Sequence, residues 1–306
     1  METNNNSPSL VWRSLLYVPA NNERFIDKAH LREADAIILD LEDSVPEAER
    51  DKARYMLEVS VEKAARNGAD VLVRINRPDD ACAQDLEAAV IPGVRALMLP
   101  KVPDAKHVNV LAGFVDELEK KRAMDPGSIL FVPMVESPAA LFRAEEIAAA
   151  HTRNAAAFLG GEDFAAAAGM IPDPETLFLP KVLTMYAARA AGIMPLGMLG
   201  TVADFKDLDV VRETVRRSRR FGFEGASCIH PSVVPVLNQE MRHSPQEVDQ
   251  AERIVSEYAE AEKSGLGAIT VDGKMIDVPV AERAAALLAR NRVIEEKEKR
   301  KNKHPR

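Results

Sequence analysis

Cysteine, long apolar runs and a basic leader are all scarce or missing in this sequence, and each shortage excludes a class of protein. Its two cysteines, Cys82 and Cys228, stand far apart in 306 residues, so they suggest neither a disulfide framework nor a zinc-ligand spacing. No apolar run approaches the roughly 20 residues that cross a bilayer. The N-terminal segment also lacks the basic and apolar regions of a signal peptide. We therefore expect a cytoplasmic protein with reduced thiols and no membrane partner.

An excess of positive charge is missing as well. The chain has 40 Lys and Arg residues against 48 Asp and Glu residues, which gives a formal net charge of -8. This balance disfavours a nucleic-acid partner, because nucleic-acid binders neutralise phosphates with basic side chains. It does not exclude an anionic substrate, since a few arginines in a cleft outweigh a negative surface locally.

The sequence does contain short apolar runs that alternate with amphipathic helical patterns. Runs this apolar are typical of strands buried on both faces, as in a parallel sheet. The eight predicted strands begin at Ser14, Ala36, Val71, Ala96, Ile129, Ala156, Met194 and Gly225. Helices are predicted between them, among others at residues 46–67, 104–122 and 208–221. Eight strands with helical crossovers predict an α/β fold, the TIM (β/α)8 barrel; a doubly wound open sheet is the alternative.

Past the eighth strand the pattern changes, so we divide the chain into a barrel at residues 1–240 and a C-terminal arm at residues 241–306. The arm begins with a helix capped by Ser244. Its next segment has ITV and MIDV on either side of Asp272-Gly273, which predicts a hairpin. A last helix covers AERAAALLARN. We expect this arm to be too small to bury a core, and to pack on the barrel or on a neighbouring subunit.

Polar residues follow the predicted strands at their C-terminal ends, where TIM barrels place catalytic groups. Glu136 follows the fifth strand and Asp163 the sixth. Carboxylates without His or Cys suit a hard ion such as Mg²⁺, and Mn²⁺ accepts the same ligands. The alternative is that these carboxylates cap helices or form surface ion pairs.

Three further strand-end features have two interpretations each. Arg74 ends an apolar strand, so it either pairs with Asp40, Glu42 or Asp43 or faces a cleft that holds an anion. The pair Gly160-Gly161 marks a tight turn or lets the backbone approach a ligand. His230 follows the eighth strand, and we expect it to cap a helix rather than line the site.

Eight blocks in order along the chain carry a family resemblance. They read RSLLYVPANNERFIDKA, ADAIILDLEDSVPEAERDKAR, VRIN, LPKV, VPMVESPAAL, GGEDFAAAAG, CIHPSVV and GKMIDVPVAERA. Together they resemble the HpcH/HpaI aldolase/citrate lyase family, in the citrate lyase β-subunit-like branch that includes malyl-CoA, β-methylmalyl-CoA and citramalyl-CoA lyases. The resemblance covers nearly the whole chain. It implies a TIM barrel that assembles as a homotrimer or a hexamer.

The resemblance also implies roles for particular residues. Glu136 and Asp163 match the Mg²⁺ ligands of the family, and Arg74 matches an arginine that contacts the keto-acid or thioester oxygen. Asp277 matches an aspartate that the arm of one subunit delivers to the site of its neighbour. The residues implied in substrate or CoA binding are Arg24, Lys28, Glu42, Asp43, Arg50, Lys101 and Gly161. Two departures stand out, since Ala20 replaces a usual glycine and Arg50 a usual lysine.

The expected reaction is a reversible Claisen-type cleavage. A 3-hydroxy-3-carboxy acyl-CoA would yield an acyl-CoA and a small 2-keto acid, with Mg²⁺ as the cofactor. Three alternatives remain open at this point. The chain would act as a citrate lyase β subunit on an acyl-carrier-protein thioester, as a pyruvate-type aldolase without a thioester, or as a non-catalytic paralogue that binds CoA esters.

Overall fold

The computed structural model describes residues 10–77, 79–201 and 205–303. Its central feature is an eight-stranded parallel sheet in the order β7-β6-β5-β4-β3-β2-β1-β8. The strands are β1 (Ser14–Pro19), β2 (Ala36–Asp40), β3 (Asp70–Arg74), β4 (Val94–Leu99), β5 (Leu130–Val135), β6 (Ala156–Leu159), β7 (Met194–Pro195) and β8 (Ala226–Cys228). All eight predicted strands are present.

The sheet closes into a barrel between β7 and β8. Leu196 and Gly225 form a parallel bridge, and the N–H of Gly197 donates to the carbonyl oxygen of Gly225 at 2.8 Å. This closure excludes the open-sheet alternative and confirms the TIM-like barrel. The seventh strand is shorter than the predicted run from Met194, because Gly197 takes a left-handed φ of 137° that ends the extended backbone.

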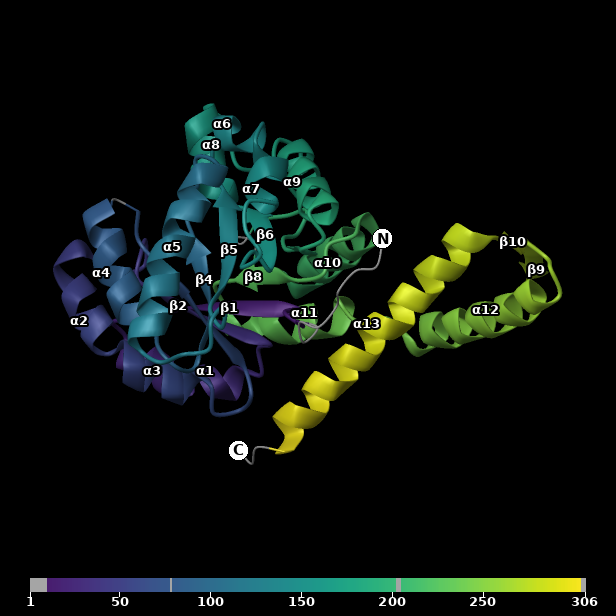
Figure 1. The fold of residues 1–306 in the computed structure, drawn as a ribbon, viewed down its shortest axis with the longest axis horizontal. Coiled ribbons are helices and arrows are strands. Elements are labelled where there is room, and N and C mark those ends of the chain that lie inside the picture. The colour runs from purple at the N-terminus through teal and green to yellow at the C-terminus, as the bar shows by residue number, and fades with distance from the viewer. Residues whose placement is uncertain (1–9, 78, 202–204, 304–306) are drawn as a thin grey trace. The chain divides into compact units, whose positions relative to one another are not determined.

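Helices surround the strands (Figure 1). They are α1 (Glu23–Ala29), α2 (Arg50–Tyr55), α3 (Leu57–Ala64), α4 (Asp79–Ala89), α5 (Ala105–Lys121), α6 (Pro138–Leu141), α7 (Ala144–Ala148), α8 (Gly161–Ala168), α9 (Phe178–Ala190), α10 (Leu208–Phe221) and α11 (Val234–Glu240), with 3₁₀ turns η1 (His30–Arg32), η2 (Glu47–Glu49) and η3 (Pro231–Val233). Their apolar faces and the strands form one large core. None of the described helices is long and apolar enough to cross a membrane.

Two of the three predicted helices are confirmed and one is corrected. Asp104 caps α5 by accepting from the N–H of His107 at 2.9 Å, and α10 ends at Gly222 as predicted. The single helix expected at residues 46–67 is instead η2, α2 and α3. The break falls at Met56, whose carbonyl oxygen accepts from the hydroxyl of Ser60 at 2.8 Å, a bond that bends helices.

A second compact unit comprises residues 242–303 together with Leu10 and Val11. It contains α12 (Pro245–Lys263), the hairpin of β9 (Ile269–Val271) and β10 (Lys274–Ile276), and α13 (Val278–Lys303). Ser244 caps α12 with a full capping box. The expectation that this module buries no core is wrong. Ala251, Ile254 and Tyr258 of α12 form a small buried cluster with side chains of the hairpin and α13, because the hairpin folds back onto the two helices.

Barrel closure predicts a stability difference between two glycines. A Cβ at Gly225 would overlap the carbonyl oxygen of Trp12, whereas a Cβ at Gly113 in α5 meets nothing within 4 Å. We expect Gly225→Ala to lower the free energy of unfolding by about 1–3 kcal/mol. Gly113→Ala should raise it by roughly 0.5–1 kcal/mol, because alanine is the better helix former. Urea unfolding measures both, and a Gly225→Ala variant as stable as the wild type would contradict the role of this contact.

Candidate functional site

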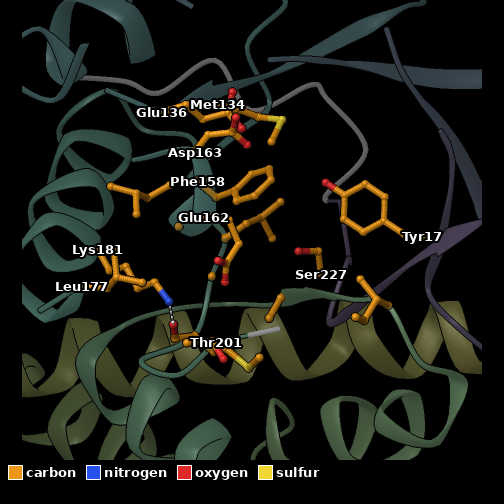
Figure 2. Close-up of a pocket in the computed structure, with 18 of the residues that line it drawn as sticks. Tyr17, Met134, Glu136, Phe158, Glu162, Asp163, Leu177, Lys181, Thr201 and Ser227 are labelled. Atoms are coloured by element: carbon orange, nitrogen blue, oxygen red, sulfur yellow. Dashed lines mark hydrogen bonds between the residues drawn. The ribbon is translucent and has the colours of Figure 1, made fainter. Parts of the chain in front are cut away.

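A cavity of about 370 Å³ opens at the C-terminal ends of the barrel strands. Figure 2 shows Glu136 and Asp163 near one end of the cavity and Lys181 and Thr201 toward the other, with Tyr17 at the side. The cavity therefore lies at the strand ends where the sequence analysis expects the catalytic groups. Of the residues expected in the site, it is lined by Asp43, Arg74, Glu136, Gly161 and Asp163.

Glu136 is a buried carboxylate held by two neighbouring strand ends. Its side chain follows β5, is only 4% exposed and accepts the N–H of Lys101, after β4, at 2.5 Å. On the β6 side it lies against Gly160, where a Cβ would overlap the carboxylate. Burial raises the pKa of Glu136 to about 8, and the charges of Asp163 and Glu42 add to this effect. A cation beside Glu136 would favour its charged form.

Asp163 lies in the first turn of α8, directly after β6. The helix begins at Gly161, and the residue before it, Gly160, offers no side-chain cap. The first N–H groups of α8 therefore stay available for an anion. Since Gly160, Gly161, Glu162 and Asp163 all line the cavity, the positive end of this helix faces the same space as the carboxylate of Asp163.

Lys101 links the carboxylates on three strand ends. Its backbone has a left-handed φ of 51°, and its Nζ lies 2.7 Å from Glu42 Oε1 and 3.5 Å from Asp163 Oδ1. Burial alone would lower the pKa of Lys101, but the hydrogen bond to Glu42 and the surrounding carboxylate charges raise it to about 12. Lys101 is therefore a fixed cation in an otherwise acidic cluster.

Arg74 is both paired and exposed to the cavity. Its Nε and Nη2 donate to the two oxygens of Asp40, each at 2.7 Å, and its Nη1 donates to Asp43 at 2.9 Å. Glu42 Oε2 also lies 3.0 Å from Nη1, without hydrogen-bond geometry. Although burial opposes it, the pairing with Arg74 keeps the pKa of Asp40 below its usual value. The buried ion pair is thus present, and the guanidinium still lines the cavity.

The residues of this cluster suit a hard divalent ion. Five carboxylates (Asp40, Glu42, Asp43, Glu136 and Asp163) stand against two cations, Arg74 and Lys101. In the described part of the chain no three Asp, Glu, His or Cys side chains make a complete metal site. Glu136 and Asp163 would therefore hold Mg²⁺ with waters or substrate oxygens as its remaining ligands.

Three predicted CoA-binding cations lie outside the cavity lining. Arg24 and Lys28 are exposed on α1, one turn apart. Arg50 begins α2, and its buried Nε has no hydrogen-bond partner among the described residues. Glu42 and Lys101 do not line the cavity either, but each interacts with a residue that does.

Asp277 and His230 both lie at helix starts. Asp277 directly precedes α13, in the C-terminal unit, and its Oδ1 accepts from the N–H of Val280 at 3.4 Å. His230 caps η3 as expected, since its Nδ1 accepts from the N–H of Ser232. Its ring also stacks on Phe205, with the centroids 4.9 Å apart.

Tyr17 and Lys181 are among the cavity residues that the sequence analysis missed. Tyr17 lies near the end of β1. The guanidinium carbon Cζ of Arg74 lies over the ring of Tyr17, 4.9 Å from the ring centroid. Lys181 of α9 is 8% exposed, and its Nζ donates to the carbonyl oxygens of Met198 and Gly200. Burial lowers the pKa of Lys181 to about 8. Its sequence signal, which the sequence analysis did not use, is a lone lysine within the apolar run of α9.

Comparison with known proteins confirms the resemblance. The model of the HpcH/HpaI aldolase/citrate lyase family matches residues 13–231. Citrate lyase subunit beta of Escherichia coli (strain K12) is 33% identical over 281 residues, 91% of this chain and 92% of that protein. A (3S)-malyl-CoA thioesterase of Cereibacter sphaeroides is 33% identical over 269 residues, 87% of this chain and 90% of that protein.

Solved structures agree with this assignment. Protein CitE from Mycobacterium tuberculosis, in complex with magnesium, acetoacetate and coenzyme A, matches with a TM-score of 0.71 and 28% identity, over 93% of this chain and 99% of that one. A citrate lyase beta subunit from the same organism, complexed with oxaloacetate and magnesium, matches with a TM-score of 0.62 over 76% of this chain and 98% of that one, at 28% identity. The chain belongs to the HpcH/HpaI aldolase/citrate lyase family and is an enzyme of the lyase class.

Proposed function

We propose that this chain is a Mg²⁺-dependent carbon–carbon lyase that reversibly cleaves a 3-hydroxy-3-carboxy acyl-CoA into an acyl-CoA and a 2-keto acid. The main support is the pair of carboxylates, Glu136 and Asp163, that share one cavity with Arg74. The ligands of the solved relatives are consistent with this reaction, since they include magnesium, keto acids and coenzyme A.

Each residue of the site has a part in this proposal. Glu136 and Asp163 would hold Mg²⁺, which when bound would supply Lewis-acid chemistry at the keto-acid oxygen. The N–H groups at the start of α8 suit the substrate carboxylate. Arg74 stabilises negative charge on the keto-acid or enolate oxygen. Asp40 keeps its guanidinium plane in place through two hydrogen bonds.

The bonds and protons balance in the cleavage direction. The bond breaks between the thioester α-carbon and the carbon that bears the hydroxyl, and its electron pair passes to the thioester enolate. The hydroxyl oxygen gives its proton to solvent water and becomes the keto oxygen. Asp277, delivered by the C-terminal arm of a neighbouring subunit in a homotrimer or hexamer, returns a proton to the α-carbon.

The phosphates of CoA have candidate partners in three cations. Arg24 and Lys28 present adjacent charges on α1, and Arg50 has a buried Nε without a hydrogen-bond partner among the described residues. A buried guanidinium N–H without an acceptor favours an incoming anion. These cations favour CoA as the carrier of the thioester.

A second candidate function is that of a citrate lyase β subunit, which would act on an acyl-carrier-protein thioester. The 33% identity to citrate lyase subunit beta favours it. Turnover of CoA esters by the isolated chain with Mg²⁺ supports the first proposal, whereas turnover only with an acyl-carrier-protein thioester supports the second.

The metal site makes the first functional prediction. Glu136→Gln and Asp163→Asn should each abolish turnover and weaken Mg²⁺ binding, because an amide replaces a charged ligand. Thermal unfolding should show that both variants fold, and Glu145→Gln, at an exposed carboxylate of α7, serves as the control. Full turnover after metal removal by EDTA, with the absence of metal confirmed by elemental analysis, would refute the metal dependence.

Arg74 makes the second prediction. Arg74→Lys keeps the charge but loses the planar fork that bonds to Asp40. We expect turnover to fall by roughly a hundredfold, which corresponds to about 2.7 kcal/mol of transition-state stabilisation. Steady-state kinetics with the exposed Arg66→Lys variant as the control measures this loss. Wild-type kinetics in a folded Arg74→Lys protein would make Arg74 a structural residue only.

Asp277 makes the third prediction, on a site shared between subunits. Asp277→Asn should keep most of the helix cap but lose the proton acceptor, so that the rate falls while stability is retained. When inactive Asp277→Asn chains and inactive Glu136→Gln chains are dissociated, mixed in equal amounts and reassociated, activity should return to about a quarter of the wild-type value. Each site needs a chain with an intact Glu136 and a neighbour with an intact Asp277, and each kind makes up about half of the mixture. No recovery in verified mixed oligomers would mean that each site is built from one chain.

A further inference from the structure

The cavity has two chemically different walls. Asp40 and Arg74, at the ends of β2 and β3, form a charged wall. On the opposite side Met134 and Phe158 are neighbours in register on β5 and β6, and Leu196 follows β7. These three apolar side chains line the cavity and are at most 7% exposed. The apolar wall therefore begins directly beside the carboxylates of the metal site.

Glyoxylate carries only a hydrogen atom on its keto carbon, so it offers no apolar surface to the wall of Met134, Phe158 and Leu196. An alkyl group on the keto acid would cover that wall, and burial of apolar surface is favourable.

A second substrate carboxylate finds no unpaired cation among the described residues that line this cavity. Arg74 and Lys181 are the cations among the described residues that line the cavity. Arg74 is paired with Asp40 and Asp43. Lys181 donates to two backbone carbonyls. The negative charge of Glu162 also favours its charged form, and Figure 2 shows the carboxylate of Glu162 pointing into the cavity. A buried carboxylate without a counter-charge is costly.

On the basis of the proposed function, we infer that the 2-keto acid of this enzyme carries an apolar side chain, an ethyl group or larger, and that Met134, Phe158 and Leu196 form the pocket that selects it. Glyoxylate leaves this pocket unfilled. Oxaloacetate places a carboxylate where the wall offers no charge to pair with it.

Calorimetric titration of the Mg²⁺-loaded protein with single keto acids tests the inference. Affinity should rise from glyoxylate to pyruvate to 2-ketobutyrate by about fourfold for each added carbon, and oxaloacetate should bind more weakly than 2-ketobutyrate. Tighter binding of glyoxylate or oxaloacetate than of 2-ketobutyrate overturns the inference and leaves the proposed function standing. If no keto acid binds, both fall.

A variant assigns the selectivity to the apolar wall. Met134→Gln nearly keeps the volume of the side chain but makes it polar, so the advantage of 2-ketobutyrate over glyoxylate should shrink several-fold. Leu179→Gln, at a 61% exposed position of α9, should leave both affinities unchanged. An unchanged ratio in a folded Met134→Gln protein overturns the assignment to this wall. If Met134→Gln does not fold, Phe158→Leu serves in its place, with the same ratio as readout.

Discussion

The site depends on the burial of one carboxylate, that of Glu136. A carboxylate in a protein interior needs a hydrogen bond or a cation, and the barrel supplies a hydrogen bond from a neighbouring strand end. The N–H of Lys101, a residue with a left-handed backbone, donates to it. Gly160 gives it the space that any Cβ would fill. Residues that follow three consecutive strands, β4, β5 and β6, are therefore in contact at this one carboxylate.

The charge around Glu136 explains why this end of the barrel suits a metal ion. Arg74 and Lys101 neutralise only part of the surrounding carboxylates, and each is already held by hydrogen bonds to acidic partners. The remaining negative charge favours a bound cation. The same pairing makes Arg74 rigid, since its guanidinium is fixed by Asp40 before any substrate arrives. A preorganised cation of this kind stabilises a developing oxyanion without first reorganising.

The two walls of the cavity have different roles in the proposed reaction. Strands β2 and β3 contribute the charged wall, whereas β5, β6 and β7 contribute an apolar wall around Met134 and Phe158. The proposed chemistry uses the charged side together with Glu136 and Asp163. The proposed choice among keto acids rests with the apolar side, where a change in side-chain volume would leave the ion pairs of Arg74 untouched. This separation agrees with the way barrel enzymes change substrate while they keep their chemistry.

The sequence by itself determined the fold and the members of the charged cluster. Apolar runs of strand length can be buried only in a sheet covered on both faces, and polar residues after those runs must gather at one end of a parallel barrel. Asp40, Arg74, Glu136 and Asp163 were all found in this way. Only the tertiary structure decided how they pair, because a strand-end position gives no distance between side chains. It alone brought in Lys181, since the direction of a helical side chain relative to a barrel depends on how that helix packs. It also revealed the small core of the C-terminal unit, because the hairpin brings together residues that are far apart in the chain.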